Sequence, residues 1–563
     1  MVVLERLSIA FAIVFFVSSY LVPVHYLPWV AFYNEALAFA ALFFLLVAVC
    51  SRNRLIFSAP VMVLLIAAAV PLLQWGFGGV MFFGDALMPS LYLMALAMAI
   101  AVGQSSFSSA SGKRLEIAAW AMLCSALIST WIALCQWLLI VDGLLVVDIP
   151  VGGRAYANLG QPNNLATMLS MALIALLYLY EKRKLGSACG ALLAVVLLFG
   201  VAITQSRTPW LASFAILLFW GLKAPKCSAR ISWGVLLGWC GIFGFFVAAL
   251  PYISDAFLLS STAPLQRMQS LHRLELWWQL MHAVLQGPVG GYGWNQISVA
   301  QVAVSLVHPV QLMTEHSHNI LLDLLLWNGP LLGGVGIVFL FVWLLRLAWG
   351  VRTVDGLCCL LVIGVVLVHG MLEFPLEYAF FLLPVGLLLG YVAAEGKIGF
   401  RFAPPQFLVV SGVLVFGGFL GWVWYEYRVI EEDYRLMRFE TAGIGSLSAS
   451  QAAPDVLLLT QLREFVRYAR TPAVVGMDDE DLEWMGKVVQ RYPYPPSLSR
   501  YSLALAFNGR SAEADKQLLI LCSLYGADRY DEVLHAFLAM RDSYPQLRGM
   551  KVLGQPAPQL CSY

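Results

Sequence analysis

Long stretches without a single Asp, Glu, Lys or Arg fill the first three quarters of this chain. A transmembrane helix needs about 20 mostly apolar residues, and most of these stretches reach that length. The sequence therefore predicts an all-α, polytopic membrane protein with about thirteen transmembrane helices. The shortest stretches, 36–51 and 208–222, are also compatible with re-entrant segments. The thirteen stretches are 7–34, 36–51, 55–84, 86–112, 117–141, 155–180, 185–206, 208–222, 231–254, 324–345, 356–372, 378–394 and 402–425.

The composition supports a membrane protein and argues against other classes. Of 563 residues, 60% are hydrophobic and 12% are charged, whereas a typical soluble protein has about 25% charged residues. Lys and Arg total 34 and Asp and Glu total 33, so there is no basic excess with which to bind nucleic acid. We therefore expect membrane lipids, and no nucleic acid, among the partners.

The basic residues between the predicted spans indicate the orientation. Loops on the cytoplasmic side of a membrane carry the excess of Lys and Arg, and thirteen alternating spans bring most basic loop residues to one side. Before the tail, the opposite face keeps only Arg154, Arg207, Arg267 and Arg273. The N-terminus is therefore predicted inside and everything after about residue 425 outside. The first apolar stretch lacks a small-residue cleavage site and is interpreted as the first span, not as a signal peptide.

Three regions follow from this pattern. We expect N-terminal transmembrane helices over 1–140, a transmembrane core over 141–424 that contains an outer loop at 251–318, and a soluble domain over 425–563. The loop includes a charge-free run, 276–314, but Gly and Pro interrupt it, which predicts a loop with short surface helices.

The tail is rich in charges, has apolar residues at helical spacing and is punctuated by prolines. It is predicted to form paired helices. The small residues over 500–509, with Ala512 and Ala514, suggest a TPR-like helical hairpin, although one copy does not establish a repeat array. Cys522 and Cys561 are the two cysteines of this region. An oxidising compartment favours a disulfide between them, but their distance cannot be read from sequence. No Cys-x-x-Cys or Cys/His cluster indicates a metal site.

Polar side chains gather on the predicted outer face. Arg154 is followed by the amides of Gln161 and Asn163, which suit sugar hydroxyls, although a helix start with Pro162 would explain the pattern as well. Arg207 lies between two spans on the face that is poor in positive charge, where it either meets an anion or acts as an interfacial anchor.

A helix predicted at about 265–285 carries an apolar stripe and should lie in the membrane interface. On it, Arg267 is expected to meet lipid phosphate, whereas Arg273, one turn before Trp277, is the better site candidate.

A last cluster opens the tenth span, with Glu315, His316, His318, Asn319 and Asp323. Histidine can accept a proton near neutral pH, and a neighbouring carboxylate would raise its basicity. Two His residues spaced by one are weak evidence for a metal, so none is expected.

His369, Glu373 and Glu377, at spacings of four, form a weaker group, since Pro375 interrupts their helix.

These residues resemble the Wzy/WaaL superfamily of O-antigen ligases and polymerases and, within it, the PglL-like bacterial protein O-oligosaccharyltransferases. The resemblance is good over 150–395 and looser in the tail. This chain has Asn164 where many members have His. The residues that carry the resemblance are Arg207, Arg273, Trp277, His316, Ser317, His318, Asn319 and Gly329, with the segments 158–163, 369–376 and 500–509.

The resemblance implies transfer of a preassembled glycan from an undecaprenyl-pyrophosphate carrier to a Ser or Thr hydroxyl of a periplasmic protein, such as a type IV pilin. The protein would lie in the bacterial inner membrane, with its active site and its tail in the periplasm. His318, helped or replaced by His316, would be the base, and Arg207 and Arg273 would bind the pyrophosphate. The expected reaction is inverting and needs no metal or cofactor. Further contacts to glycan or acceptor are expected from Arg154, Gln161, Asn163, Asn319, Glu315, His369 and Glu373.

Three alternatives remain open at this point. An O-antigen ligase or a polymerase would use the same donor, but both usually lack so long a soluble tail. A transporter or lipid flippase should show ionisable residues in mid-membrane or inverted repeats. A structural assembly protein would explain the spans but not the polar groups on one face.

Overall fold

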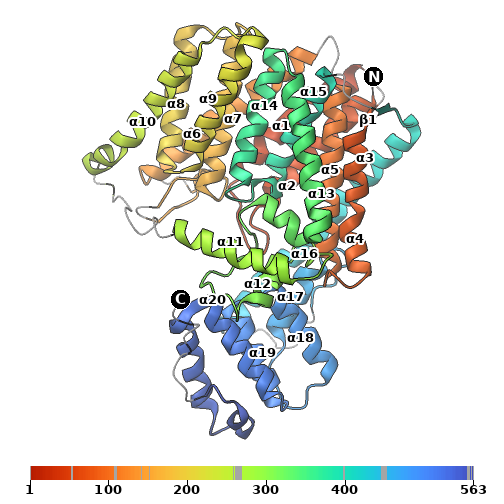
Figure 1. The fold of residues 1–563 in the computed structure, drawn as a ribbon, viewed down its shortest axis with the longest axis vertical. Helices are drawn as coiled ribbons and strands as arrows, with labels where there is room; N and C mark the ends of the chain where they lie inside the picture. The colour runs from red at the N-terminus through yellow and green to blue at the C-terminus, as the bar shows by residue number, and fades with distance from the viewer. Residues whose placement is uncertain are drawn as a thin grey trace. The chain divides into compact units, whose positions relative to one another are not determined.

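The computed structural model describes residues 2–51, 55–106, 111–140, 143–150, 153–257, 259, 269–396, 400–444, 453–553, 558 and 561. Regular structure in this part of the chain is almost entirely helical, as the sequence predicts (Figure 1). A two-residue antiparallel pairing also joins β1 (Phe57–Ser58) to β2 (Arg401–Phe402), with Phe57 opposite Phe402.

A helix lies in each of the thirteen charge-free stretches. Within the described part of the chain, nine helices are long and apolar enough to cross a membrane, with α3 and α4 counted as one helix. Helices α8, α14 and α15 are apolar but have only 17 residues each. The protein is thus a multi-pass helical membrane protein. The helices are α1 (Val2–Leu21), α2 (Phe32–Cys50), α3 (Ala59–Ala67), α4 (Ala69–Gly76), α5 (Phe83–Ser105), α6 (Ser111–Trp137), α7 (Pro162–Glu181), α8 (Ser187–Ile203), α9 (Thr208–Lys223), α10 (Trp233–Ala256), α13 (Ile320–Gly350), α14 (Val354–Gly370), α15 (Ala379–Glu395) and α16 (Gln406–Thr441).

The ends of some helices differ from the ends of the charge-free stretches. The first stretch continues to residue 34, but α1 ends at Leu21, ahead of Pro23 and Pro28. Proline lacks an N–H group and disfavours helical geometry in the residue before it, so absence of charge alone overestimates this span. In the opposite sense, α16 continues past residue 425 to Thr441 because charged side chains do not end a helix.

The described chain divides into two compact units, and each is assembled from segments that are distant in sequence. The first unit comprises Met1–Ala68, Leu91–Pro264 and Leu340–Trp424. The second comprises Ala69–Ser90, Leu265–Phe339 and Tyr425–Tyr563.

Close helix packing characterises the first unit. A Cβ at Gly103 on α5 would lie 2.1 Å from the carbonyl oxygen of Leu387 on α15, and one at Gly390 would lie 2.1 Å from that of Ile100. These glycines let two apolar helices approach at backbone distance, as is common in membranes. The fully buried Tyr20 donates its hydroxyl hydrogen to the carbonyl of Phe380 at 2.6 Å.

The second unit contains the predicted outer loop from residue 265 onward and the tail, whereas residues 251–256, also predicted as loop, are the end of α10. The loop forms α11 (Gln269–Gln286) and α12 (Ile297–Val304) with irregular backbone between and after them, as predicted. The tail forms α17 (Thr460–Arg470), α18 (Asp479–Arg491), α19 (Pro495–Phe507) and α20 (Ser511–Met540). Gly509, at φ +79°, makes the turn of the α19–α20 hairpin. Short 3-10 turns lie at η1 (Ala224–Cys227), η3 (Pro375–Glu377) and η4 (Pro545–Gly549).

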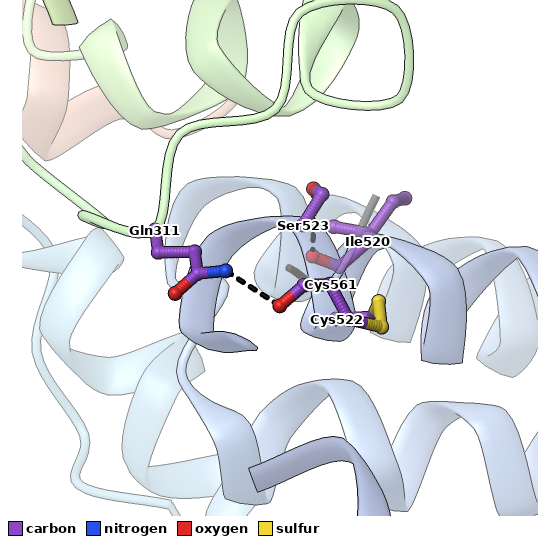
Figure 2. The surroundings of a disulfide bond; sticks show 5 residues. All are labelled: Gln311, Ile520, Cys522, Ser523 and Cys561. Atoms are coloured by element: carbon purple, nitrogen blue, oxygen red, sulfur yellow. Dashed lines mark hydrogen bonds between the residues drawn. A yellow bond between two sulfur atoms is a disulfide. The ribbon is translucent and has the colours of Figure 1, made fainter. Parts of the chain in front are cut away.

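A disulfide joins Cys522 on α20 to Cys561 near the C-terminus, so the pairing that the sequence left open is present (Figure 2). The Cα atoms are 5.0 Å apart, and both residues are buried. The side chain of Gln311 donates to the carbonyl of Cys561 at 2.6 Å, which ties the outer loop to the cross-linked end of the chain.

Candidate functional site

Asn163 is the centre of a polar network in the first unit. Its Oδ1 accepts hydrogen bonds from the Ser206 hydroxyl at 2.6 Å and from Nη2 of Arg154 at 3.3 Å. Its amide nitrogen donates to Glu373 at 3.2 Å, and Gln161 donates to the same carboxylate at 3.4 Å. Four residues that the sequence placed in two separate groups, namely Arg154, Gln161, Asn163 and Glu373, therefore lie together.

Local sequence explains how this network is held. Gln161 has an extended backbone and precedes Pro162, which starts α7. The amide side chains of Gln161 and Asn163 therefore both project from the start of that helix. The other side of the network is the turn after α14, where the N–H of Glu373 donates to the carbonyl of His369 at 2.9 Å. His369 is fully buried, and its Nδ1 lies 2.9 Å from the Thr167 hydroxyl. The break near Pro375 thus turns Glu373 toward α7.

Arg207 lies next to this network but is not tied into it. It is exposed at the start of α9, and no hydrogen bond or ion pair joins its side chain to the described residues. The preceding hairpin is fixed, since Ser206 bonds to Asn163 and the Thr204 carbonyl accepts from Nε of Arg154 at 2.8 Å. A guanidinium on a rigid hairpin, at the positive end of a helix dipole, suits an anion.

In the second unit, several hydrogen bonds hold the segment before α13. Asn319 caps this helix, because its Oδ1 accepts from the N–H groups of Leu321 and Leu322 at 3.0 and 3.2 Å. Asp323 reaches back to accept from the N–H of Ser317 at 3.0 Å. The Ser317 hydroxyl donates to the Asn319 carbonyl at 2.9 Å. The structure therefore gives Asn319 and Asp323 clear roles in local geometry.

The two histidines flank the fully buried Ser317, outside any helix. His318 has φ +57°, a left-handed conformation that is uncommon for a residue with a side chain. Such strain persists only where neighbouring contacts enforce it, and it clusters at functional sites. Both histidines are half-buried.

Helix α11 brings Trp277 to this segment. Its indole N–H donates to the carbonyl of Ser317 at 2.8 Å. The half-buried Arg273 lies one turn earlier on the same helix. The predicted apolar stripe is exposed, with 60% of Leu274 and 67% of Trp278 accessible, whereas Leu276 and Leu280 pack inward. An exposed stripe of this kind fits a helix in the membrane interface. Residues 265–268, Arg267 among them, lie outside the described part.

Sequence reasoning missed a buried ion cluster around Arg491, at the end of α18. The guanidinium contacts both carboxylate oxygens of Asp85, with Nε at 3.2 and 3.1 Å, and its Nη1 lies 3.5 Å from Glu315. Tyr494 donates its hydroxyl hydrogen to the other oxygen of Glu315. Burial opposes ionisation of Glu315, but Arg491 and the Tyr494 hydroxyl together hold the pKa of this carboxyl below its usual value.

A signal for this cluster did exist in the sequence. Asp85 is the single charged residue between the stretches 55–84 and 86–112. A lone carboxylate in an apolar span needs a partner, and this is a reason to search for a cation elsewhere in the chain. Glu35 is a comparable case and is buried against the indole N–H of Trp29 at 3.0 Å. The partner of Asp85 was not predictable, because Arg491 lies 406 residues away.

The chain is similar to known proteins over these same regions. The family described as "O-Antigen ligase" matches residues 192–333, "Protein glycosylation ligase" matches 155–180, and "Virulence factor membrane-bound polymerase, C-terminal" matches 357–537. A general O-oligosaccharyltransferase of Acinetobacter baylyi is 29% identical over 91% of each chain. The chain is thus similar to PglL-like protein O-oligosaccharyltransferases over most of its length.

A second relative from the same organism is the ComP-specific O-oligosaccharyltransferase. It is 30% identical over 56% of this chain and 58% of its own length. Both curated relatives are oligosaccharyltransferases, so the enzyme acts in O-linked protein glycosylation and is a glycosyltransferase. The transporter and structural interpretations are not supported by these similarities.

Proposed function

We propose that this oligosaccharyltransferase transfers a preassembled glycan en bloc from undecaprenyl pyrophosphate to a Ser or Thr hydroxyl of a periplasmic protein, such as a type IV pilin. The name of one relative specifies a single acceptor, ComP, which fits an enzyme that recognises a protein and not only a glycan. The observation that carries the chemical part of the proposal is the left-handed His318 in a segment fixed by Ser317, Asn319 and Asp323.

In the proposed reaction, the acceptor oxygen attacks the anomeric carbon while the bond from that carbon to the pyrophosphate oxygen breaks. His318, helped or replaced by His316, accepts the proton from the acceptor hydroxyl. Arg207 and Arg273 neutralise the departing lipid pyrophosphate. Direct attack inverts the configuration of the sugar. The energy resides in the leaving group, so the proposal requires no metal or cofactor.

The amide network has a different role in the proposal. Arg154, Gln161, Asn163, His369 and Glu373 shape the site for sugar hydroxyls, since amides and one carboxylate offer both donors and acceptors. Their mutual hydrogen bonds keep these groups in place before the glycan arrives. Asn319 and Glu315 support the His318 segment, through the helix cap and the Arg491 cluster.

The proposed topology has thirteen spans in the bacterial inner membrane, with the N-terminus in the cytoplasm and the tail, a TPR-like helical domain, in the periplasm. The disulfide of the second unit supports this orientation, because disulfides persist in oxidising compartments. A reporter active only in the periplasm, fused after residue 443, should be active, and one fused after residue 184 should be silent. The opposite pattern would place the proposed site in the wrong compartment.

The activity test uses the purified enzyme, a lipid-linked glycan and a candidate pilin. The proposal predicts a mass increase of one whole glycan on a pilin Ser or Thr, and no glycan transfer to lipid A core. Transfer to lipid A core or elongation of the lipid-linked glycan, with an unmodified pilin, would instead favour a ligase or a polymerase.

A further inference from the structure

The tail of the second unit contacts the segment that contains the proposed base. Arg491 is only 7% exposed, and Asp85, which receives three of its hydrogen bonds, is 1% exposed. The remaining nitrogen of this guanidinium, Nη1, donates to Glu315, the residue directly before His316. Arg491 and Asp85 are both deeply buried and fix one another in place, since separating them would leave an unpaired charge away from water, whereas the Glu315 side chain is 35% exposed.

Two further bonds position Arg491 and its neighbours. The Ser298 hydroxyl on α12 donates to the carbonyl of Arg491 at 2.8 Å, so the end of α18 is held against the outer loop. Tyr525 on α20 donates to the carbonyl of Pro493 at 3.2 Å, which fixes the turn that carries Tyr494. The hydroxyl of Tyr494 therefore meets Glu315 from a rigid part of the tail.

A second attachment lies four residues earlier on the same segment. The Gln311 amide donates to the carbonyl of Cys561, whose position is set by the disulfide to Cys522 (Figure 2). A Cβ at Gly526 would come within 2.8 Å of the Gln311 side chain, so α20 also packs closely there. The segment 311–319 thus contacts the tail at both Gln311 and Glu315.

We propose that Arg491 and Tyr494 are positioning residues for the transfer reaction, and that the tail completes the active segment by holding Glu315 and, through it, the strained His318. This inference rests on the proposed role of His318. It gives the tail a part in the chemical step, in addition to any part in acceptor binding. Misplacement of a reacting group by about 1 Å can cost about 100-fold in rate, so small contacts at Glu315 should affect turnover.

The test uses the full-length enzyme and two mild variants. Tyr494→Phe removes one hydroxyl, and Glu315→Gln removes one charge. Arg491→Lys is the harsher third variant, because it keeps the positive charge but loses the planar guanidinium that makes several hydrogen bonds at once. We expect Tyr494→Phe and Glu315→Gln to lower kcat about 10-fold while KM for donor and acceptor changes less than about 2-fold. Amide hydrogen exchange over 311–321 should become about 10-fold faster.

Tyr468→Phe is the matched control, since its buried hydroxyl donates to the carbonyl of Ser497 within the tail. It should change neither kcat nor exchange in the segment. The proposal is overturned if Tyr494→Phe and Glu315→Gln behave like this control, or if exchange quickens with no loss of kcat. If His318→Asn transfers glycan normally while Tyr494→Phe still quickens exchange and slows turnover, the base assignment fails but the positioning role stands.

Discussion

The two polar regions of this enzyme are built on different principles. Around Asn163, neutral amides, one arginine and one carboxylate satisfy one another, and the exposed Arg207 is added at the edge. Around His318, the backbone is strained and is held by a helix cap and a buried ion cluster. The first arrangement suits binding, because its polar groups are already in place before a ligand arrives. The second suits chemistry, because it fixes the His318 side chain even though this requires a strained backbone conformation.

The largest expected effect follows from removing the proposed base. His318→Asn should keep the backbone, since Asn tolerates the left-handed conformation, and should lower transfer by about 10² to 10⁴. His535→Ala, on the exposed face of α20, is the control and should transfer normally. Rates are measured as glycan transferred per enzyme at saturating acceptor. Near-normal transfer by both His318→Asn and His316→Ala would contradict the assignment.

The next effect concerns the exposed guanidinium of the first unit. Arg207→Lys should lower transfer about 100-fold, because a point charge does not reproduce the bidentate contact to a pyrophosphate. Arg230→Lys is the matched control, as this exposed arginine donates to the carbonyl of Tyr180 in a different loop. Equal activity of the two variants would mean that Arg207 is an interfacial anchor.

A binding role for the amide network predicts a different kinetic signature. Asn163→Asp places a second carboxylate near Glu373, and repulsion should open the network. We expect KM for the donor to rise about 10-fold with kcat reduced less than about 3-fold. Asn508→Asp, at an amide with similar hydrogen bonds inside the tail, serves as the control. A loss confined to kcat would assign Asn163 to the chemical step.

The smallest effect on activity is expected at the disulfide, which should act mainly on stability. Cys522→Ser opens a loop with a sequence separation of 39 residues, and this should cost the tail about 4 kcal/mol. The unfolding temperature of the tail should fall by about 10 °C. Adding reductant should not lower the unfolding temperature of the variant any further. An unchanged unfolding temperature would show that the cross-link does not stabilise the domain.

Sequence alone predicted the helical fold and named several residues of both polar regions, because apolar length and local motifs are short-range properties. It did not predict how the residues combine. Arg154 and Asn163 are close in sequence, but Glu373 lies 210 residues beyond Asn163, and only the tertiary fold brings it to them. The role of Arg491 was missed because buried ion pairing depends on the tertiary fold, and the strain at His318 has no signature in composition.

The central claim is that Arg207 serves donor binding while His318 serves the chemical step. Its most direct test is the affinity of the purified enzyme for lipid-linked glycan without acceptor. We predict that His318→Asn binds the donor within about 3-fold of the unmodified enzyme, and that Arg207→Ala binds it at least about 10-fold more weakly. Normal donor binding by Arg207→Ala, with loss of binding by His318→Asn, would contradict the account.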